Sequence, residues 1–357
     1  MARDARRPLR PGAPGFWRIP LSDQDLTQRM ADAYTRIKSE VHHRIVGMDD
    51  VIDLLLFGIL SGGHCLLMGV PGLAKTLLLS SLSELLDLKF SRIQFTPDLM
   101  PSDIVGTEVI TENPDTAERQ FRLMTGPIFA NIVLADEINR TPPKTQAALM
   151  EAMEEHQVTI GGRTHPLAAP FFVLATQNPI EQEGTYPLPA AQLDRFTFLI
   201  QVTYPSRQEE YTIIRRTTTS RPKSLSPVLA GGEILQMMAL VRREPAPADV
   251  VAFATESARA TRPQDADPNS RVAQYLSFGV GPRGAQSVVL AAKVRALLQG
   301  RRHPNRSDVE ALIPHAFGHR MILNFRAAAE GVTVTDILHD ILSGQAAASP
   351  RGKSRAR

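Results

Sequence analysis

The chain has 357 residues, of which 43% are hydrophobic and 22% are charged, a composition typical of a globular protein with room for two domains. The formal net charge is +3, but residues 1–18 contribute +4 and residues 349–357 contribute another +4; subtracting both tails leaves −5 for the body. An acidic body gives no indication of a nucleic-acid-binding face, and the single cysteine, Cys65, excludes a disulfide framework or a cysteine-based metal site. We expect a disordered basic arm over residues 1–22 and a disordered basic tail over residues 346–357.

The predicted elements begin with a helix over residues 23–43. Residues 51–70 are apolar enough to suggest a membrane span, but charged and polar residues and the Gly62-Gly63 pair interrupt them. A buried helix, a tight turn and a buried strand are therefore predicted there. Because the N-terminus carries no apolar leader, we expect a cytoplasmic protein that does not insert into a membrane.

Five short apolar runs follow, separated by helical or glycine-containing stretches. Apolar runs without alternation, interleaved with helices, indicate a parallel sheet covered on both faces, so an α/β domain is predicted over residues 23–204. Between the third and fourth runs, the alternating Gln157-Val158-Thr159-Ile160 and a glycine pair predict an inserted hairpin. The five runs are residues 65–68, 93–95, 132–135, 171–175 and 198–200.

Beyond residue 204 the pattern changes to successive helices. Ser206 with Glu209, and Ser307 with Glu310, fit the capping box in which two side chains satisfy free backbone N–H groups at a helix start. A small all-α domain is therefore predicted over residues 205–345.

A glycine-rich turn lies between a predicted buried strand and a helical pattern, the context that a phosphate-binding Walker A loop requires. Its backbone N–H groups would hold the phosphates, Lys75 would neutralise the β- and γ-phosphates of ATP, and Thr76 would bind Mg²⁺ through its hydroxyl. The residue before the lysine, usually glycine, is Ala74, and alanine fits there if it keeps a negative φ. The predicted ATP-binding residues are Gly69, Pro71, Gly72, Leu73, Ala74, Lys75, Thr76 and Leu77.

Two adjacent carboxylates, Asp136 and Glu137, end the third apolar run. Side chains at successive strand positions point to opposite sides, so the two can do different work. Asp136 would hold Mg²⁺, a hard cation that prefers oxygen ligands and water. Glu137 would orient and deprotonate the attacking water. Together with the Walker A loop, the pair predicts Mg²⁺-dependent ATP hydrolysis.

With both motifs in place, the chain resembles the MoxR family of AAA+ ATPases, which shares the alanine before the lysine. The resemblance runs from about Ile45 to Arg320 and does not cover the two tails. It is carried by residues 63–76, 92–103, 135–155, 175–179 and 191–196.

The resemblance implies roles for further residues. Asn178 matches sensor 1, whose amide can donate to the γ-phosphate and accept from the water. Arg195 matches the arginine finger, which stabilises charge developing on the γ-phosphate of the neighbouring subunit. Arg283 matches sensor 2 on the lid, and Val46-Gly47 matches the segment beside the adenine.

The resemblance also implies an architecture and an assembly. We expect a three-layer α/β/α AAA+ domain with sheet order 5-1-4-3-2, a helical lid and a homo-oligomeric, hexameric ring with shared active sites. Residues 157–165 match the pre-sensor-1 hairpin, and residues 108–127 match an insertion within the second core helix.

Several functions stay open. Family members act on a partner with a von Willebrand factor A domain, which favours a chaperone-like ATPase for remodelling or metal-cofactor maturation of a protein. A chelatase-type motor subunit shares the same insertions. A nucleic-acid motor is disfavoured, because the hairpin offers only Arg163 and His165 and the body is acidic. A nucleotide-gated scaffold is disfavoured because the catalytic residues are all retained.

Overall fold

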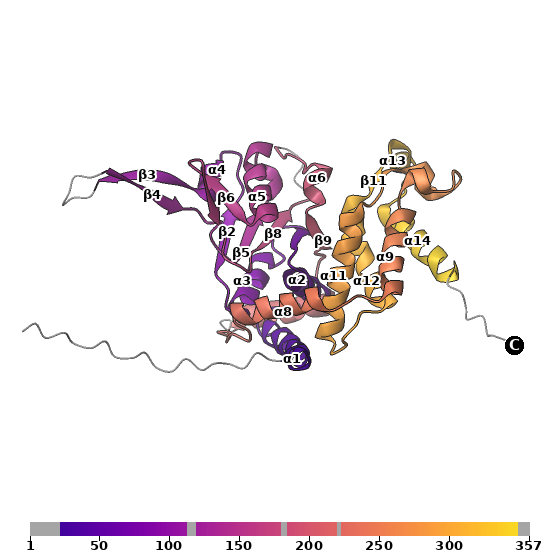
Figure 1. The fold of residues 1–357 in the computed structure, drawn as a ribbon, viewed down its shortest axis with the longest axis horizontal. Helices are drawn as coiled ribbons and strands as arrows, with labels where there is room; N and C mark the ends of the chain where they lie inside the picture. The colour runs from indigo at the N-terminus through magenta and orange to yellow at the C-terminus, as the bar shows by residue number, and fades with distance from the viewer. Residues whose placement is uncertain (1–21, 113–118, 180–183, 220–222, 349–357) are drawn as a thin grey trace, which may run out of the picture.

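The computed structural model describes residues 22–112, 119–179, 184–219 and 223–348 (Figure 1). The predicted arm and tail thus fall almost entirely outside the described residues. Helix α14 (Val334–Ala348) continues past residue 345, where the helical domain was expected to end. In the described ranges, no helix combines the length and the apolar character needed to cross a membrane.

A five-stranded parallel sheet, in the order β2-β5-β8-β1-β9, forms the middle layer of the larger domain. Each strand overlaps one predicted apolar run. Numbered one to five along the chain, these strands have the predicted order 5-1-4-3-2, so the expected AAA+ fold is confirmed. The strands are β1 (His64–Met68), β2 (Phe90–Gln94), β5 (Ile132–Asp136), β8 (Phe172–Gln177) and β9 (Phe196–Gln201).

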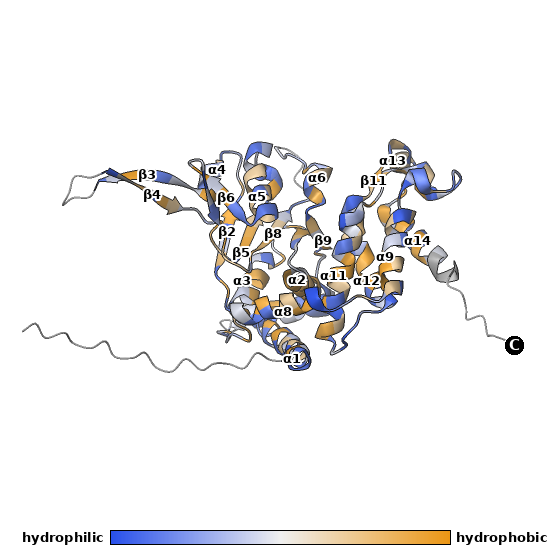
Figure 2. Cartoon of the chain, viewed as in Figure 1, coloured by the Kyte–Doolittle hydropathy of each residue, from blue (hydrophilic) through white to orange (hydrophobic). Residues whose placement is uncertain are grey.

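Both faces of the sheet are buried along β1, β5 and β8, which explains the absence of polar alternation in their apolar runs, whereas the edge strand β2 exposes Arg92 and Gln94. Cys65 and Leu67 of β1 belong to one hydrophobic core, whereas Leu66 between them belongs to the other. Figure 2 shows hydrophobic residues gathered along the central strands and on the helices that cover them. The first core is covered by α1 (Asp23–Val41), α2 (Asp49–Ser61), α3 (Lys75–Leu85) and α8 (Gly231–Arg243), and the second by α4 (Pro101–Val105) and α5 (Pro143–Glu155).

The second domain, the lid, is helical as predicted and adds one short ribbon. Its strands β10 (Leu276–Phe278) and β11 (Ile322–Leu323) pair antiparallel. The lid shares the first hydrophobic core with the sheet domain, which fixes the two domains against one another. Besides α8, the helices after the sheet are α7 (Arg207–Thr219), α9 (Ala248–Ala260), α10 (Arg271–Tyr275), α11 (Pro282–Leu298), α12 (Arg306–Phe317), α13 (Phe325–Glu330) and α14. The remaining short helices are α6 (Ala190–Leu193) and η1 (Ile138–Arg140) in the sheet domain, and η2 (Pro263–Asp265) and η3 (Gly318–Arg320) in the lid.

The two predicted capping boxes differ in outcome. At the start of α7, the Ser206 N–H donates to Glu209 Oε2 at 2.8 Å, as predicted. At the start of α12, the box consists of Asn305 and Asp308, whose Oδ2 accepts from the Asn305 N–H at 2.8 Å. The prediction of Ser307 with Glu310 was wrong because asparagine caps a helix as well as serine does.

Two hairpins extend from the sheet domain. β6 (Gln157–Ile160) and β7 (Arg163–Pro166) form the hairpin predicted over residues 157–165. β3 (Gly106–Glu112) and β4 (Arg119–Thr125) form a longer ribbon that projects away from the body (Figure 1). The ribbon occupies the predicted insertion and begins at Gly106, whose φ of 97° and close approach to the Met124 carbonyl exclude a side chain.

Candidate functional site

The Walker A loop leaves the carboxyl end of β1 and leads into α3. Since β5, β8 and β1 are parallel neighbours, the residues that follow each strand meet at one edge of the sheet, here called the nucleotide edge. The Gly69 N–H donates to the Gln177 carbonyl at 3.3 Å, which ties the loop to the end of β8. A Cβ on Gly69 would come within 2.6 Å of the Val202 carbonyl, so the loop requires glycine there.

Ala74 does not have the negative φ under which alanine would fit this position of the loop without strain. Its φ is 52°, in the left-handed region, and it is the N-cap of α3. The condition of a negative φ is therefore not met. The loop keeps the backbone shape that glycine adopts freely, and the alanine carries the steric strain.

Lys75 lies half-buried at the nucleotide edge. Its Nζ donates to the Gly69 carbonyl at 2.5 Å, so the side chain folds back over the loop. Burial lowers the pKa of Lys75, while the charges of Asp136 and Glu137 act in the opposite direction. The lysine and both carboxylates thus share one electrostatic environment.

Thr176 of β8 connects the two predicted acidic residues. Its hydroxyl donates to Asp136 Oδ1 at 2.6 Å and accepts from the Glu137 N–H at 2.9 Å. Asp136 Oδ2 also accepts from Arg92 on the neighbouring strand β2, at 2.6 Å. Sequence reasoning assigned no role to Thr176 or Arg92. The only available signal was their place within segments that carry the resemblance.

Glu137 is not a strand residue. It follows β5 with a φ of 57° and is the N-cap of η1, so strand alternation does not set its direction and that prediction was wrong. Its Oε2 accepts from Gln94 Nε2 at 3.0 Å and pairs with Arg140 Nε at 3.2 Å. Gln94 Oε1 in turn accepts from Arg92 Nη2 at 2.8 Å, so side chains of β2 link Glu137 to Asp136 at the nucleotide edge.

The donor set fits Mg²⁺ and ATP. The Thr76 hydroxyl and Asp136 carboxylate are hard oxygen ligands, and Mg²⁺ completes its shell with phosphate oxygens and water. A Cβ at Gly72 would meet no atom within 4 Å, so the loop has open space for phosphates. Asn178, which follows β8, is 7% exposed at the same edge. The Walker A loop, Asp136 and Asn178 therefore follow three neighbouring strands at the same edge of the sheet.

Val46 and Gly47 form a turn between α1 and α2. Gly47 has a φ of 69°, and a side chain on it would collide with the Glu209 carboxylate at the start of α7. Arg216 of α7 also donates to the His42 carbonyl at 2.9 Å. The segment predicted to lie beside the adenine thus packs against the first helix after the sheet.

Arg195 and Arg283 lie at the opposite edge of the sheet. Arg195 directly precedes β9, whose first residue Phe196 pairs with His64 at the start of β1. At roughly 3.3 Å per residue, β1 separates this amino edge from the nucleotide edge by about 13 Å. Neither arginine therefore lies at the nucleotide edge with Lys75.

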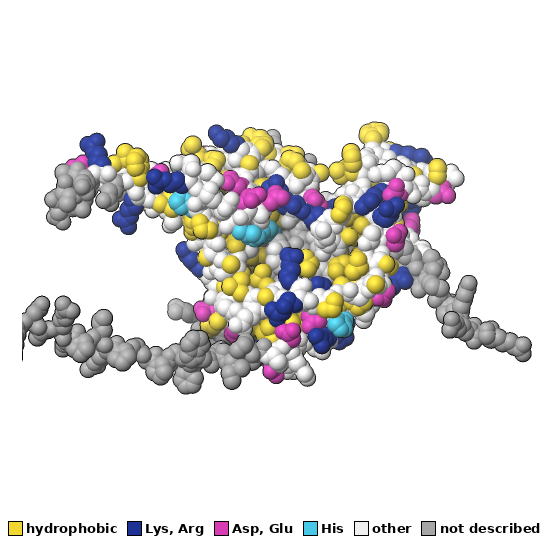
Figure 3. Space-filling model, viewed as in Figure 1, with side chains coloured by type: hydrophobic (Ala, Val, Ile, Leu, Met, Phe, Trp, Pro, Cys, Tyr) yellow, Lys and Arg dark blue, Asp and Glu magenta, His cyan; other side chains and the backbone are white. Residues whose placement is uncertain are grey.

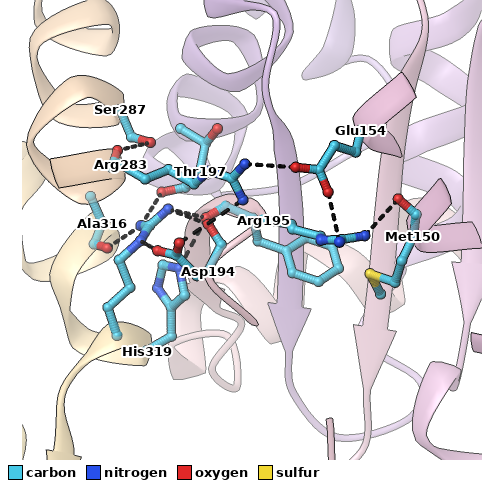
Figure 4. A network of polar contacts seen from close by, with 11 residues as sticks. Met150, Glu154, Asp194, Arg195, Thr197, Arg283, Ser287, Ala316 and His319 are labelled. Atoms are coloured by element: carbon cyan, nitrogen blue, oxygen red, sulfur yellow. Dashed lines mark hydrogen bonds and ion pairs between the residues drawn. The ribbon is translucent and has the colours of Figure 1, made fainter. Parts of the chain in front are cut away.

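Glu154, at the end of α5, joins the two arginines (Figure 4). Its Oε2 lies 2.6 Å from Arg195 Nη2, and its Oε1 accepts from Arg283 Nη2 at 3.0 Å. Arg195 Nη1 also donates to the Met150 carbonyl at 2.9 Å. The intramolecular partner of Arg195 is therefore Glu154.

Asp194 instead pairs with Arg320, whose side chain is 2% exposed. Arg320 Nε donates to Asp194 Oδ1 at 2.7 Å, and its terminal nitrogens donate to the carbonyls of Asp194, Phe196, Thr197 and Ala316. Arg320 thus fixes the lid to the start of β9, and sequence reasoning missed it.

A cleft of about 290 Å³ opens beside the arginine pair, between α5 and the lid. Arg195, Arg283 and Arg242 line it together with Glu154. Figure 3 shows acidic and basic side chains next to one another near the middle of the viewed face, between α5 and the lid helices. The amino edge thus presents more positive than negative charge.

Comparison with known proteins agrees with this geometry. Residues 64–198 match the model of the ATPase family associated with various cellular activities (AAA), and residues 268–341 match the AAA lid domain. A crystal structure from Cytophaga hutchinsonii, described as a candidate ATPase, superimposes with a TM-score of 0.83 at 38% identity, covering 90% of this chain and 96% of that one.

Curated relatives are similar over most of the chain. The chain is 41% identical to Chaperone MoxR1 of Mycobacterium tuberculosis, over 85% of this chain and 79% of that protein. It is 42% identical to the protein YeaC of Bacillus subtilis, over 85% and 91% respectively. Protein MoxR of Methylorubrum extorquens is 29% identical, over 82% and 88%. The chain therefore belongs to the MoxR family of chaperone-like AAA ATPases.

Proposed function

We propose that the protein hydrolyses Mg²⁺-bound ATP in a ring of identical subunits, with each active site shared between two neighbours. Lys75, Thr76 and Asp136 bind the nucleotide and its metal, and Glu137 activates the water. Arg195 and Arg283 complete the site from the next subunit. The ring is proposed to be a hexamer.

One observation carries this proposal: the two halves of the catalytic apparatus lie at opposite edges of the same sheet. The nucleotide edge holds the loop and the carboxylates, while the amino edge presents two arginines about 13 Å or more away. Subunits arranged head to tail would bring these two edges together, and such heterologous contacts close into rings. A planar guanidinium delivered there would stabilise the charge that develops in phosphoryl transfer.

Mixing two inactive variants tests the shared site. Glu137→Gln keeps the arginines but cannot activate water, whereas Arg195→Ala keeps Glu137 but supplies no finger. We expect each alone to bind ATP with little turnover. An equal mixture should recover about a quarter of wild-type activity, the share of interfaces that combine one intact half from each variant.

A second mixture supplies the control. Glu137→Gln with Lys75→Ala leaves every nucleotide half defective, so no activity should return even though all arginines are intact. Recovery in this control, or no recovery in the first mixture, contradicts the shared site. Turnover that persists after chelation of Mg²⁺ contradicts the metal requirement.

We further propose that ATP turnover remodels a protein or helps its metal-cofactor maturation, and that the partner carries a von Willebrand factor A domain. The chaperone name of the Mycobacterium relative supports a protein client, and the resemblance to the MoxR family suggests the von Willebrand factor A domain. A chelatase-type motor is the alternative, and co-purification of the partner distinguishes the two. Arg163 on β7 faces Glu108 at 4.0 Å, which leaves the hairpin little free positive charge for a nucleic-acid motor. DNA-stimulated turnover with a steep salt dependence would favour that motor.

We propose a cytoplasmic location for the protein. Cell fractionation tests it, and recovery in a membrane or secreted fraction would contradict it.

A further inference from the structure

Glu154 occupies a position that none of the proposed catalytic roles includes. Its two carboxylate oxygens each engage a different arginine, one from the sheet domain and one from the lid. Arg195 comes from the segment before β9, and Arg283 from the first turn of α11. Two guanidinium groups so close together repel each other, and the carboxylate between them removes most of that repulsion.

Stability does not explain this arrangement. The side chains of Glu154, Arg195 and Arg283 are 37%, 30% and 45% exposed. Ion pairs exposed to this extent contribute little to the free energy of folding, because water already solvates the separated charges. The buried attachment of the lid comes from Arg320 instead, whose side chain is 2% exposed.

The geometry leaves the arginines able to bind a further anion. A guanidinium has five N–H donors. Among the described residues, Arg195 uses its two terminal nitrogens on Glu154 and the Met150 carbonyl, which leaves its Nε–H and one hydrogen on each terminal nitrogen. Arg283 makes one close contact with Glu154 and a longer one, 3.9 Å, with Asp194. A phosphate could therefore bind both arginines without displacing Glu154.

We propose that Glu154 is a positioning residue, which holds Arg195 and Arg283 side by side so that both reach the phosphate of the neighbouring subunit as one unit. Because Glu154 contacts both arginines, it positions the lid and the arginine finger together. The inference rests on the proposed shared site and adds the residue that orders its arginine half.

The test is the steady-state ATPase of the full-length protein carrying Glu154→Gln, which keeps the shape of the side chain and removes its charge. A displacement of about 1 Å in catalytic groups lowers rates by up to roughly 100-fold, so we expect a 10- to 100-fold fall in kcat. KM should stay within about two-fold, because the nucleotide half is untouched. Glu155→Gln, one residue along the same helix, is the matched control and should behave as wild type.

A variant that lacks both arginines separates positioning from a structural role. If Glu154 acts through the two arginines, adding Glu154→Gln to the Arg195→Ala, Arg283→Ala double variant should cause no further loss of turnover. A further loss in the triple variant would mean an independent effect and would overturn the inference. So would wild-type turnover in Glu154→Gln, or faster turnover, which would mean that the carboxylate opposes the arginines.

The same measurements keep the two proposals apart. If Arg195→Ala lowers kcat and Glu154→Gln does not, only the role of Glu154 is lost. If Arg195→Ala turns over ATP like wild type, the shared site fails, and the role of Glu154 fails with it.

Discussion

Arg320 offers a direct test of how the lid is fixed to the sheet domain. Its guanidinium forms an ion pair with Asp194 at 2.7 Å and donates to three backbone carbonyls around the start of β9 and to the Ala316 carbonyl in α12. Replacing it with alanine leaves these buried acceptors without donors. It also leaves the Asp194 carboxylate without its closest partner.

The expected loss follows from the burial of the two groups. Removing one partner of a buried ion pair costs about 3–5 kcal/mol. Asp194 is 37% exposed and can regain some water, so we expect the lower end, about 3 kcal/mol. With a denaturant slope of about 3 kcal/mol per molar for a chain of this size, the urea midpoint should fall by about 1 M.

Urea denaturation of nucleotide-free protein, followed by circular dichroism, measures this shift. Arg243→Ala is the control, because its pair with Asp23 is exposed on both sides (57% and 50%) and should leave the midpoint nearly unchanged. Arg320→Lys should fall between the two, since lysine keeps the charge but not the planar set of donors. If Arg320→Ala unfolds at the same urea concentration as Arg243→Ala, the buried network does not stabilise the lid.

Two further predictions concern stability. Ala74→Gly removes a backbone strain of about 1–2 kcal/mol, and the greater freedom of glycine in the unfolded chain offsets part of this gain. The free energy of unfolding should therefore rise by about 0.5–1 kcal/mol. A lower urea midpoint for Ala74→Gly than for wild type would contradict the strain. Burial lowers the pKa of His64 to about 4, and its Nδ1 accepts from the Val173 N–H, which requires the neutral ring. The neutral form is favoured by folding, so this contribution is complete above the unfolded pKa of 6.5 and is lost as the pH falls towards 4. Between pH 7 and pH 5, His64→Gln should therefore lose about 2 kcal/mol less stability than wild type, and equal losses in the two proteins would contradict the assignment.

The elements of the sheet domain were predictable because local pattern sets them. A strand buried on both faces is apolar at nearly every position, so β1, β5 and β8 each appear in the sequence as a clear apolar run. The Walker A loop was predictable for a similar reason, since close backbone packing requires glycine at Gly69. The backbone conformation inside the motifs was not predictable from the sequence. The left-handed φ values of Ala74 and Glu137 depend on how the surrounding chain closes, and neither residue type signals them.

By itself, the sequence pattern predicted a parallel α/β domain and a Walker A loop with paired carboxylates, and the resemblance to the MoxR family supplied the strand order. Glycine positions, apolar runs and paired carboxylates depend on contacts close in the chain, and such contacts leave a readable pattern. Only the tertiary structure decided where the arginines lie and what holds them. Glu154 meets Arg195 and Arg283, and Arg320 meets Asp194, across long stretches of chain. The sequence around a charged residue gives no indication of which distant residue becomes its partner in the folded protein.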